Sequence, residues 1–264
     1  MRITAKGVVN RDQEVTFLFD SKPYKGFVGD TVASALLAND VNLVGRSFKY
    51  HRPRGILGIG SEEPNALISV HKGGKIDPNV RATTQEIYEG LIVTSQNSWP
   101  SLKFDALAIN DILAPFFSAG FYYKTFMWPP RFWEALYEPI IRHAAGLGKL
   151  DSEPDVDNYD QNFAFCDLLI IGGGPSGLFS ALLAGRAGLD VILVDENPKF
   201  GGRLLFENTI IDGNHCLDWI QSCLGELKSL KNVRLLSRAT VFGIYDQGTF
   251  GVLERISRHI QESE

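Results

Sequence analysis

The stretch from Asp167 to Glu196 constrains the fold of this chain more than any other part of the sequence. Leu168–Ile171 is a continuous apolar run, which predicts a strand buried on both faces of a parallel sheet. The run leads directly into the motif Gly172-x-Gly174-x-x-Gly177. In such a motif the first glycine permits a sharp turn, the second lets a pyrophosphate approach the backbone, and the third lets the helix pack against the strand. The sequence therefore predicts a strand, a tight turn and a helix.

The residues after this motif complete the pattern of a dinucleotide site. A second buried run, Val191–Val194, ends in Asp195 and Glu196, and Asp195 lies eighteen residues beyond Gly177. This is close to the spacing of about 20 residues expected for a carboxylate that accepts hydrogen bonds from an adenosine ribose. The helix N-terminus attracts the phosphates through its N–H groups and its dipole. We interpret the stretch as a dinucleotide site; a Rossmann-like unit that has lost its ligand is the alternative.

The charges near the expected ribose bear on the choice of dinucleotide. Asp195 and Glu196 are adjacent carboxylates without an arginine beside them on that turn, and they would repel the 2′-phosphate of NADP. NAD and FAD both remain open. The doublet Gly201-Gly202, followed by Arg203, resembles the second glycine doublet of many flavoproteins, which alone would favour FAD. A plain glycine turn would give the same residues.

Composition and charge exclude several other classes. No apolar run approaches the ~20 residues that span a bilayer, and the first fifteen residues lack the apolar core of a secretory signal, so we expect a cytoplasmic protein without a membrane partner. Residues 1–150 carry 17 basic and 14 acidic side chains, whereas residues 151–264 carry 9 and 17, which argues against nucleic acid as a partner. We interpret the three cysteines, which lack metal-ligand spacing, as buried or incidental thiols: Cys166, Cys216 and Cys223.

The first hundred residues have the element order of a small β-grasp domain. Residues 13–28 predict a hairpin, residues 32–38 a short helix, and Val41–Val44 and Ala66–Val70 further strands. Between those strands, Gly45–Gly55 contains four fixed positive charges among aromatic residues. We interpret this segment as a solvated loop or a contact to another polypeptide rather than as a nucleic-acid patch.

Side chains capable of acid–base or nucleophilic chemistry follow no recognisable pattern. His51 and His71 have no carboxylate or cysteine at ligand spacing, so we predict neither as a metal ligand nor as a catalytic base. A paired acid and base is equally missing from the rest of the sequence. We therefore predict no catalytic residue and no metal site in this chain.

Residues 81–162 connect the two predicted domains. Residues 81–99 have a helical pattern, and Phe116–Trp133 contains nine aromatic residues in eighteen, which would either wrap over the core of this chain or dock a partner subunit. Residues 131–145 predict a helix that is kinked or broken at Pro139. Lys149–Asn162 is polar and acidic and predicts a linker.

The chain beyond the acidic turn predicts a helix from about His215 to Leu230, strands at 233–236 and 240–245, and a charged helix at Val252–Ile260. A dinucleotide domain of the flavoprotein type needs later strands, and only about 100 residues follow the linker. We expect the domain to be incomplete, with unpaired backbone groups or exposed apolar surface after Tyr245, and the chain to be an N-terminal part of a longer one.

Four segments together resemble the α subunit of heterotetrameric sarcosine oxidase. They are Gly45–Gly55, Ser61–Ala66, Ser118–Trp128 and Cys166–Gly177, and they occur in the same order. Members of this family oxidise N-methylglycine (sarcosine) to glycine with a flavin and molecular oxygen. They release hydrogen peroxide and formaldehyde, or pass the one-carbon unit to tetrahydrofolate. The resemblance implies a subunit of a flavin-dependent oxidoreductase that acts on CH–NH groups.

The resemblance also implies how the work is divided among subunits. The amine is oxidised at a flavin on the β subunit, a covalently attached FMN lies near the α–β interface, and the assembled complex, with its γ and δ subunits, contains FAD and FMN. The glycine-motif domain of the α subunit holds NAD, with FAD as the alternative at the same site. Carried onto this sequence, the cofactor-binding residues are Gly172, Gly174, Ser176, Gly177, Asp195, Glu196, Asn197, Arg203 and Val241.

The amino-terminal domain resembles the 2Fe–2S ferredoxin domain of related amine and opine oxidases. Those relatives hold the cluster with a C-x-x-x-x-C-x-x-C loop, whereas the corresponding loop here, Leu57–Ala66, has no thiolate, so iron–sulfur reconstitution is expected to fail. We predict an α/β chain in three parts. These are a cluster-free, ferredoxin-like β-grasp domain over residues 1–100, an aromatic-rich connecting segment and acidic linker over 101–162, and a truncated Rossmann-type dinucleotide-binding domain over 163–264.

Further expectations concern activity. Full α subunits are much longer and include a carboxy-terminal folate-binding-type domain, so we expect the isolated chain to associate and to lack sarcosine oxidase activity. Asp195→Ala is expected to weaken NAD binding by about 1.5–3 kcal/mol while the fold stays intact. The rival interpretations are a non-catalytic assembly module with a vestigial nucleotide site and an FAD-binding fragment of another amine oxidoreductase.

Overall fold

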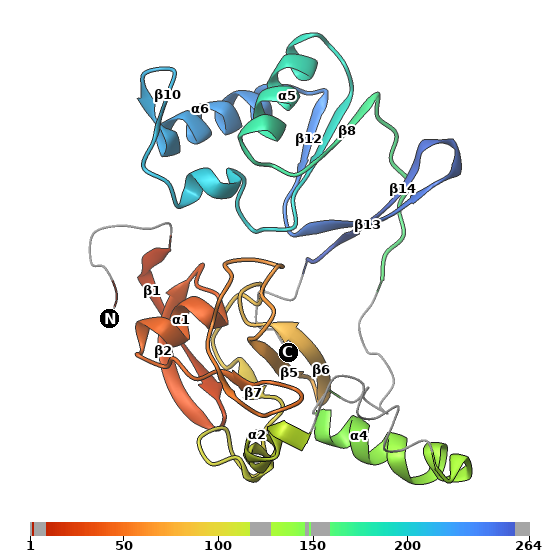
Figure 1. Ribbon diagram of the computed structural model, residues 1–264. Helices are drawn as coiled ribbons and strands as arrows, with labels where there is room; N and C mark the ends of the chain where they lie inside the picture. The colour runs from red at the N-terminus through yellow and green to blue at the C-terminus, as the bar shows by residue number, and fades with distance from the viewer. Residues whose placement is uncertain (1, 3–8, 117–127, 146–147, 149–158, 257–264) are drawn as a thin grey trace. The chain divides into compact units, whose positions relative to one another are not determined.

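The computed structural model describes Arg2, residues 9–116, residues 128–145, Gly148 and residues 159–256 (Figure 1). The chain divides into two compact units. The first contains most residues up to Val156, and the second contains most residues from Asp157 to Arg258. Each unit has its own hydrophobic core.

The first unit is built on a five-stranded mixed sheet. Its strands are β1 (Asn10–Phe19), β2 (Lys22–Val28), β5 (Leu67–Lys72), β6 (Lys75–Arg81) and β7 (Ile92–Ser95). Their order in the sheet is β2-β1-β7-β5-β6, so the last strand in sequence lies at the centre. β7 runs parallel to β1, while the other neighbouring pairs are antiparallel. Two hairpins joined by a central parallel strand form a β-grasp sheet.

Alternating burial explains how this sheet acquires a core. In β1 the side chains of Val15, Phe17 and Phe19 point to one face and are buried. They pack with α1 (Val32–Ala38), which begins at a Thr31 N-cap and buries Leu36 completely. Each fully buried side chain of this size stabilises the fold by about 1.5–3 kcal/mol.

Short elements complete the first unit. β3 (Gly45–Arg46) pairs with β4 (Pro53–Arg54) in a separate two-stranded sheet. The helical segments that follow are η1 (Ala106–Ala108), α2 (Ile109–Ile112), η2 (Ala114–Phe116), η3 (Pro130–Phe132), η4 (Trp133–Tyr137) and α4 (Glu138–Ala145). Within the helix predicted at residues 131–145, the α-helical part, α4, begins at Glu138, beside Pro139. None of the described helices is long and apolar enough to cross a membrane.

The second unit contains a three-stranded parallel sheet. Its strands are β8 (Leu168–Ile171), β9 (Val191–Val194) and β12 (Val233–Leu236), in the order β12-β9-β8. α5 (Pro175–Arg186) connects β8 to β9, and α6 (Cys216–Ser229) precedes β12. The remaining elements are η5 (Gly202–Leu205), β10 (Ile210–Ile211), β11 (Asn214–His215), β13 (Ala239–Tyr245), η6 (Asp246–Gly248) and β14 (Thr249–Glu254).

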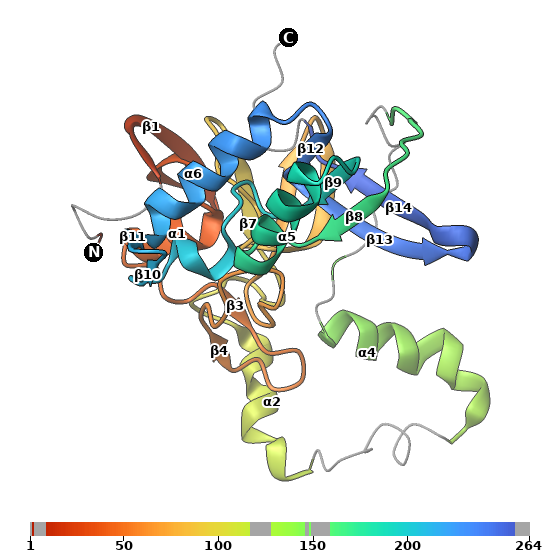
Figure 2. The same cartoon turned by 90° about the horizontal axis from the view of Figure 1, so that it is seen from above.

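The two faces of this parallel sheet pack against different elements. Val191 and Leu193 of β9 belong to the core that includes α5 and α6, which contact each other (Figure 2). Ile192 and Val194 point to the opposite face and pack with Ala239 of β13. β9 is therefore buried on both faces, as its uninterrupted apolar sequence requires.

β8 differs from the prediction because it lies at the edge of the sheet. Leu168 is 37% exposed and Ile171 is 55% exposed, although the sequence predicts a strand buried on both faces. The apolar run is the same length as that of β9, so sequence alone does not distinguish the edge strand from the central one.

Two predictions for the first unit are wrong. Val41–Val44 is not a strand; its ends donate hydrogen bonds to Leu36 and Arg54, and the apolar residues pack on the core from a loop. Residues 81–99 are not a helix. Local hydrogen bonds are confined to short turns, such as Gln85 N–H to the Arg81 carbonyl, whereas Ile87 and Gly90 donate to the distant carbonyls of Asp30 and Thr16. The helical spacing of buried residues there arises from a turn followed by β7.

The predicted helix at Val252–Ile260 is also wrong where the structure describes it. Val252 pairs with Val241 and Leu253 pairs with Thr240, so this segment is part of β14. Of the two features expected after Tyr245, unpaired backbone is not found directly after this residue, because Tyr245 pairs with Thr249 in the β13–β14 hairpin. Exposed apolar side chains are found there, at Leu253 and Ile256. Residues 117–127 of the aromatic run and residues 149–158 of the predicted linker lie outside the described residues.

Candidate dinucleotide-binding site

The glycine motif forms the turn between β8 and α5. Gly172 has a φ of +100°, a conformation that other residues rarely adopt. A Cβ atom at Gly177 would lie 1.9 Å from the carbonyl oxygen of Gly172, so only glycine allows this approach of helix to strand. A Cβ at Gly174 would meet nothing within 4 Å. Two of the three glycines are therefore required by the fold, whereas Gly174 borders open space.

The N-terminus of α5 faces this turn without a capping side chain. Gly174 is its N-cap residue, and Pro175 occupies the first turn. Leu178 donates the first regular hydrogen bond of the helix, to the carbonyl of Gly174 at 2.9 Å, and Ser176 is exposed on the first turn. N–H groups and the helix dipole at such a terminus attract an anion, and a pyrophosphate fits this requirement.

Asp195, at the end of β9, is tied to the glycine turn. Its side chain is only 6% exposed, and its Oδ2 accepts a hydrogen bond from the Gly173 N–H at 2.6 Å. Its Oδ1 accepts from the backbone and side-chain nitrogens of Asn197, at 2.8 and 3.0 Å. Glu196 is exposed, and its carbonyl accepts from the guanidinium of Arg255 at 2.7 Å. Asp195 thus has a structural role, and we no longer expect Asp195→Ala to leave the fold intact.

The second glycine doublet packs against the first motif. The N–H of Gly201 donates to the carbonyl of Gly173 at 2.7 Å. Gly202 has a φ of +54°, and a Cβ there would lie 3.0 Å from the Cα of Gly174. Sequence analysis identified both motifs but not their contact. The doublet closes one side of the turn and leaves the α5 N-terminus open.

The remaining predicted contacts differ in how close they come to this turn. Val241 of β13 is half-buried in the same small core as Val194, and the neighbouring Ala239 N–H donates to the carbonyl of Asp195 at 2.9 Å. Arg203 follows the doublet on η5, but its exposed guanidinium is paired with Glu207 on the same segment. The structure therefore brings Val241 beside the acidic turn and directs the Arg203 side chain to Glu207.

The first unit contains a buried histidine–carboxylate pair that the sequence does not predict. His51 Nδ1 lies 2.7 Å from Asp105 Oδ2, and both side chains are fully buried. Asp105 also accepts hydrogen bonds from the N–H groups of Trp99 and Leu107. The two residues lie 54 positions apart in sequence, so no local pattern predicts that they pair. Because solvent reaches neither side chain, the pair holds the chain after β7 in place and is unsuited to catalysis.

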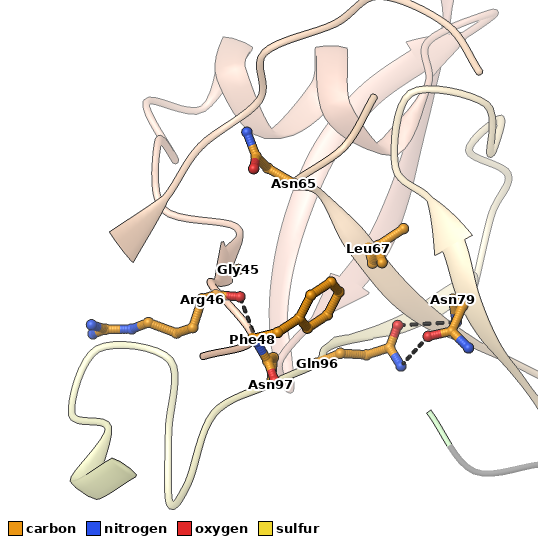
Figure 3. Close-up of a pocket in the computed structure, with 8 residues that line it drawn as sticks. All are labelled: Gly45, Arg46, Phe48, Asn65, Leu67, Asn79, Gln96 and Asn97. Carbon is orange, nitrogen blue, oxygen red and sulfur yellow. Dashed lines mark hydrogen bonds between the residues drawn. The ribbon is translucent and has the colours of Figure 1, made fainter. Parts of the chain in front are cut away.

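The first unit also contains a pocket, shown in Figure 3, lined by Gly45, Arg46, Phe48, Asn65, Leu67, Asn79, Gln96 and Asn97. Asn97 donates to the carbonyl of Arg46 at 2.6 Å, and Gln96 and Asn79 bond to each other. Arg46 directs its guanidinium to the carbonyls of Leu102 and His51. The lining has amide groups but no carboxylate, thiol or histidine, so this pocket offers no acid–base or nucleophilic group.

The two buried thiols of the second unit are unsuited to nucleophilic chemistry. Burial raises the pKa of the Cys223 thiol, and the nearby Glu226 carboxylate raises it further. Cys216 is buried, with its Sγ close to the carbonyls of Leu204 and Glu207. Within the described parts of the chain, no group of three His, Cys, Asp or Glu side chains could hold a metal ion.

Two family models match the chain, one in each unit. Residues 12–98 match the 2Fe-2S iron-sulfur cluster binding domain family, and residues 167–230 match the FAD dependent oxidoreductase family. A 2Fe-2S cluster does not fit the residues of the first match, because such clusters are held by cysteine thiolates and residues 12–98 contain no cysteine.

Curated relatives cover nearly the whole chain. The sarcosine oxidase subunit alpha of Rhizobium meliloti (strain 1021) is 56% identical over 99% of this chain, and that of Corynebacterium sp. (strain U-96) is 33% identical over 97%. This chain is a relative of the sarcosine oxidase alpha subunit. It spans about a quarter of these subunits, 26% of the first and 22% of the second. The resemblance to the alpha subunit that the four sequence segments indicate is confirmed.

A solved structure supports the fold at low sequence identity. The L-proline dehydrogenase from P. horikoshii is 18% identical and superposes with a TM-score of 0.58, over 93% of this chain and 38% of the dehydrogenase chain. This likeness concerns the fold alone. Together with the two family matches it confirms the predicted fold class, a ferredoxin-like domain followed by a dinucleotide-type oxidoreductase domain.

Proposed function

We propose that the second unit binds an adenine dinucleotide, and that the dinucleotide is NAD. The observation that carries the proposal is the uncapped N-terminus of α5 above a glycine turn that is open at Gly174. Gly174, Ser176 and Gly177 would hold the pyrophosphate. Asp195 and Glu196 would face the ribose, with Asn197 beside them and Val241 beneath the adenine. Arg203 would reach the nucleotide only by leaving Glu207. A bound nicotinamide dinucleotide accepts a hydride.

FAD is the second candidate at the same site. The match of residues 167–230 to an FAD-dependent family favours it, as does the glycine doublet that packs against the motif. NADP is the third ligand to compare. The two carboxylates on the acidic turn disfavour its 2′-phosphate, but Arg255 lies against the Glu196 carbonyl and could attract it.

At the level of the assembly, we propose that the chain is the alpha-subunit portion of a cytoplasmic, heterotetrameric sarcosine oxidase. In this proposal the β, γ and δ subunits are its partners, and sarcosine and tetrahydrofolate are substrates of the complex. FAD and FMN in the complex would supply the amine oxidation, which gives glycine, hydrogen peroxide and formaldehyde or methylene-tetrahydrofolate. This chain would bind and position nucleotide and partners, since the histidine–carboxylate pair His51–Asp105 is buried.

An assembly role without nucleotide is the competing function. The observation in its favour is the exposed apolar surface of the β13–β14 hairpin. Phe242 is 65% exposed and Ile244 is 71% exposed, and Tyr245 and Leu253 are also exposed. Exposed apolar side chains gathered on one hairpin are typical of a surface that another polypeptide covers.

Calorimetric titration of the 264-residue chain with NAD, FAD and NADP tests the proposal. We expect heat of binding with NAD and weaker or no heat with NADP. Gly174→Ala should reduce NAD affinity roughly tenfold or more, because its methyl group enters the space for the pyrophosphate. Gly225→Ala on α6, whose Cβ also meets nothing within 4 Å, is the matched control and should bind as the unmodified chain does. If a folded sample binds none of the three ligands, the assembly function is favoured.

A further inference from the structure

The loop at residues 57–66 occupies the part of the first unit where a cluster-binding loop is expected, and it contains a buried carboxylate. Glu63 is 1% exposed, although the loop lies between β4 and β5 near the surface. A buried carboxylate is costly unless hydrogen bonds compensate for the water it loses. The burial of Glu63 therefore requires compensating hydrogen bonds from its surroundings.

Four backbone N–H groups donate to the Glu63 side chain. Oε2 accepts from Leu57 at 2.7 Å and from Gly58 at 2.5 Å. Oε1 accepts from Asn65 at 2.8 Å and from Ala66 at 3.1 Å. The donors come from both ends of the loop, so one carboxylate closes it. Converging backbone N–H groups of this kind form anion sites, including many that surround iron–sulfur clusters.

The glycines of the loop make room for carboxylate groups. A Cβ at Gly58 would lie 3.0 Å from Glu62 Oε1 and 3.2 Å from the Glu63 backbone, and a Cβ at Gly60 would lie 2.8 Å from Glu62 Oε2. Glu62 is exposed and caps the N–H groups at 59 and 60 through its Oε1. The chain thus supplies a loop shaped around two side-chain anions, of which only Glu63 is buried.

The charge of Glu63 is consistent with this arrangement. Burial alone would raise the pKa of its carboxyl, but the four N–H groups together outweigh burial and hold the pKa below the ordinary value of 4.5. The charged neighbours are Glu62 and Arg81, whose Nε donates to the Glu63 carbonyl at 3.2 Å. Glu63 is therefore ionised at neutral pH.

We propose that residues 57–66 form a backbone anion cradle and that the Glu63 carboxylate fills it permanently, in the place that an anionic cluster would take in a ferredoxin domain. The side chain is an internal ligand. Its removal leaves a site for a small carboxylate such as formate or acetate. This inference concerns the first unit and is independent of nucleotide binding by the second.

Three variants of the full chain test the proposal by thermal unfolding. Glu63→Gln keeps the shape but removes the charge, and its melting temperature should fall by at least about 5 °C. Glu62→Gln is the matched control with an exposed carboxylate, and its melting temperature should fall by at most about 2 °C. Glu63→Ala should recover stability in sodium formate or acetate, relative to sodium chloride at the same ionic strength, whereas the unmodified chain should not.

Two outcomes would overturn the proposal. One is an unchanged melting temperature for Glu63→Gln, and the other is a Glu63→Ala chain that responds to formate and acetate no more than the unmodified chain does. If Glu63→Ala folds only poorly, refolding in either anion replaces the melting assay. Amide hydrogen exchange of the unmodified chain is an independent measurement. The N–H groups of Leu57, Gly58, Asn65 and Ala66 should be protected, and rapid exchange at these four amides would contradict the cradle.

Discussion

Two glycine-containing loops of this chain, residues 57–66 and 172–177, use their backbone N–H groups differently. In the first loop four N–H groups converge on the carboxylate of Glu63, which belongs to the loop itself. In the second, the Gly173 N–H donates to the Asp195 carboxylate, but the N-terminus of α5 that follows has no side-chain cap and borders open space at Gly174. A cluster of backbone donors thus specifies an anion but not whether the chain or a ligand supplies it. The local sequence decides whether the chain supplies that anion.

The loops also differ in what their glycines do. Gly60 makes room for a side chain of the same loop, that of Glu62, whereas Gly177 makes room for the backbone of Gly172. A side chain can move when a neighbour grows, but a backbone carbonyl held in a turn cannot move without breaking its own hydrogen bonds. Substitutions in the second loop should therefore have the larger effects.

The largest effect is expected for Gly177→Ala. The new Cβ would lie 1.9 Å from the Gly172 carbonyl oxygen, so the helix must separate from the strand at a cost of about 3 kcal/mol or more. Gly225→Ala, at an open position of α6, should instead stabilise the chain by about 0.5–1 kcal/mol. Urea unfolding followed by circular dichroism measures both. Equal midpoints for the two variants would show that the glycine turn tolerates a side chain.

The next effect separates the two acidic residues after β9. Asp195→Asn removes the charged acceptor of the Gly173 N–H, so both stability and NAD affinity should fall, each by about 1.5–3 kcal/mol. Glu196→Gln changes an exposed side chain and should leave the unfolding midpoint unchanged. Calorimetry and thermal unfolding of both variants provide the comparison. Wild-type NAD affinity in Asp195→Asn would move the ribose contact to Glu196.

A pH series sharpens the comparison for the first loop. The pKa of Glu63 is lower in the folded chain than its ordinary value of 4.5, so its contribution to stability is present above that value and is lost as the pH falls through the folded-state pKa. The difference in melting temperature between the unmodified chain and Glu63→Gln should therefore shrink below about pH 4.5. A difference that stays constant down to pH 3 would mean that the charge of Glu63 does not stabilise the loop.

The smallest effect is expected for an ordinary surface ion pair, which sets the baseline. Arg186 on α5 bonds Glu226 on α6 at 2.6 Å, and both side chains are exposed. The hydrogen bond from Arg186 lowers the pKa of Glu226. Glu226→Gln should lower the melting temperature by at most about 2 °C at low salt and by less in 1 M salt, because solvent and ions screen the pair. A larger loss of melting temperature that does not depend on salt would show that Arg186–Glu226 is not an ordinary surface ion pair.

The sequence predicts the second unit better than the first for a physical reason. Local sequence patterns predict its elements, since apolar runs and glycines mark strands β8, β9 and β12 and the helix between the first two strands. The contact between Gly202 and Gly174 and the burial of Asp195 depend on the fold and have no local signature. Arg203 is a predicted site residue whose side-chain direction the sequence does not predict. Glu207 follows it closely in sequence, but only the structure shows that the Arg203 guanidinium pairs with it.

In the first unit, long-range contacts override local patterns. Ile87 and Leu91 have helical spacing, yet the N–H of Ile87 bonds the Asp30 carbonyl. His51 meets Asp105 across 54 residues. The sequence of the Leu57–Ala66 loop shows that the thiolates of a cluster loop are missing. It does not show that the Glu63 carboxylate accepts the backbone N–H groups of the loop. The sequence does contain a glutamate in a loop with closely spaced glycines. Only the four N–H distances show that this glutamate is an internal ligand of the loop.

The central position of β7 affects when the first unit can fold. The hairpins β1–β2 and β5–β6 connect neighbours in sequence and can each close within microseconds. β7 lies between them, and its parallel pairing joins Leu18 to Ile92. During synthesis the ribosome must therefore release the chain to beyond residue 95 before this strand can enter. Until then each hairpin presents an open edge to other nascent chains, so the interval before β7 emerges is when this unit is most exposed to aggregation and to chaperones.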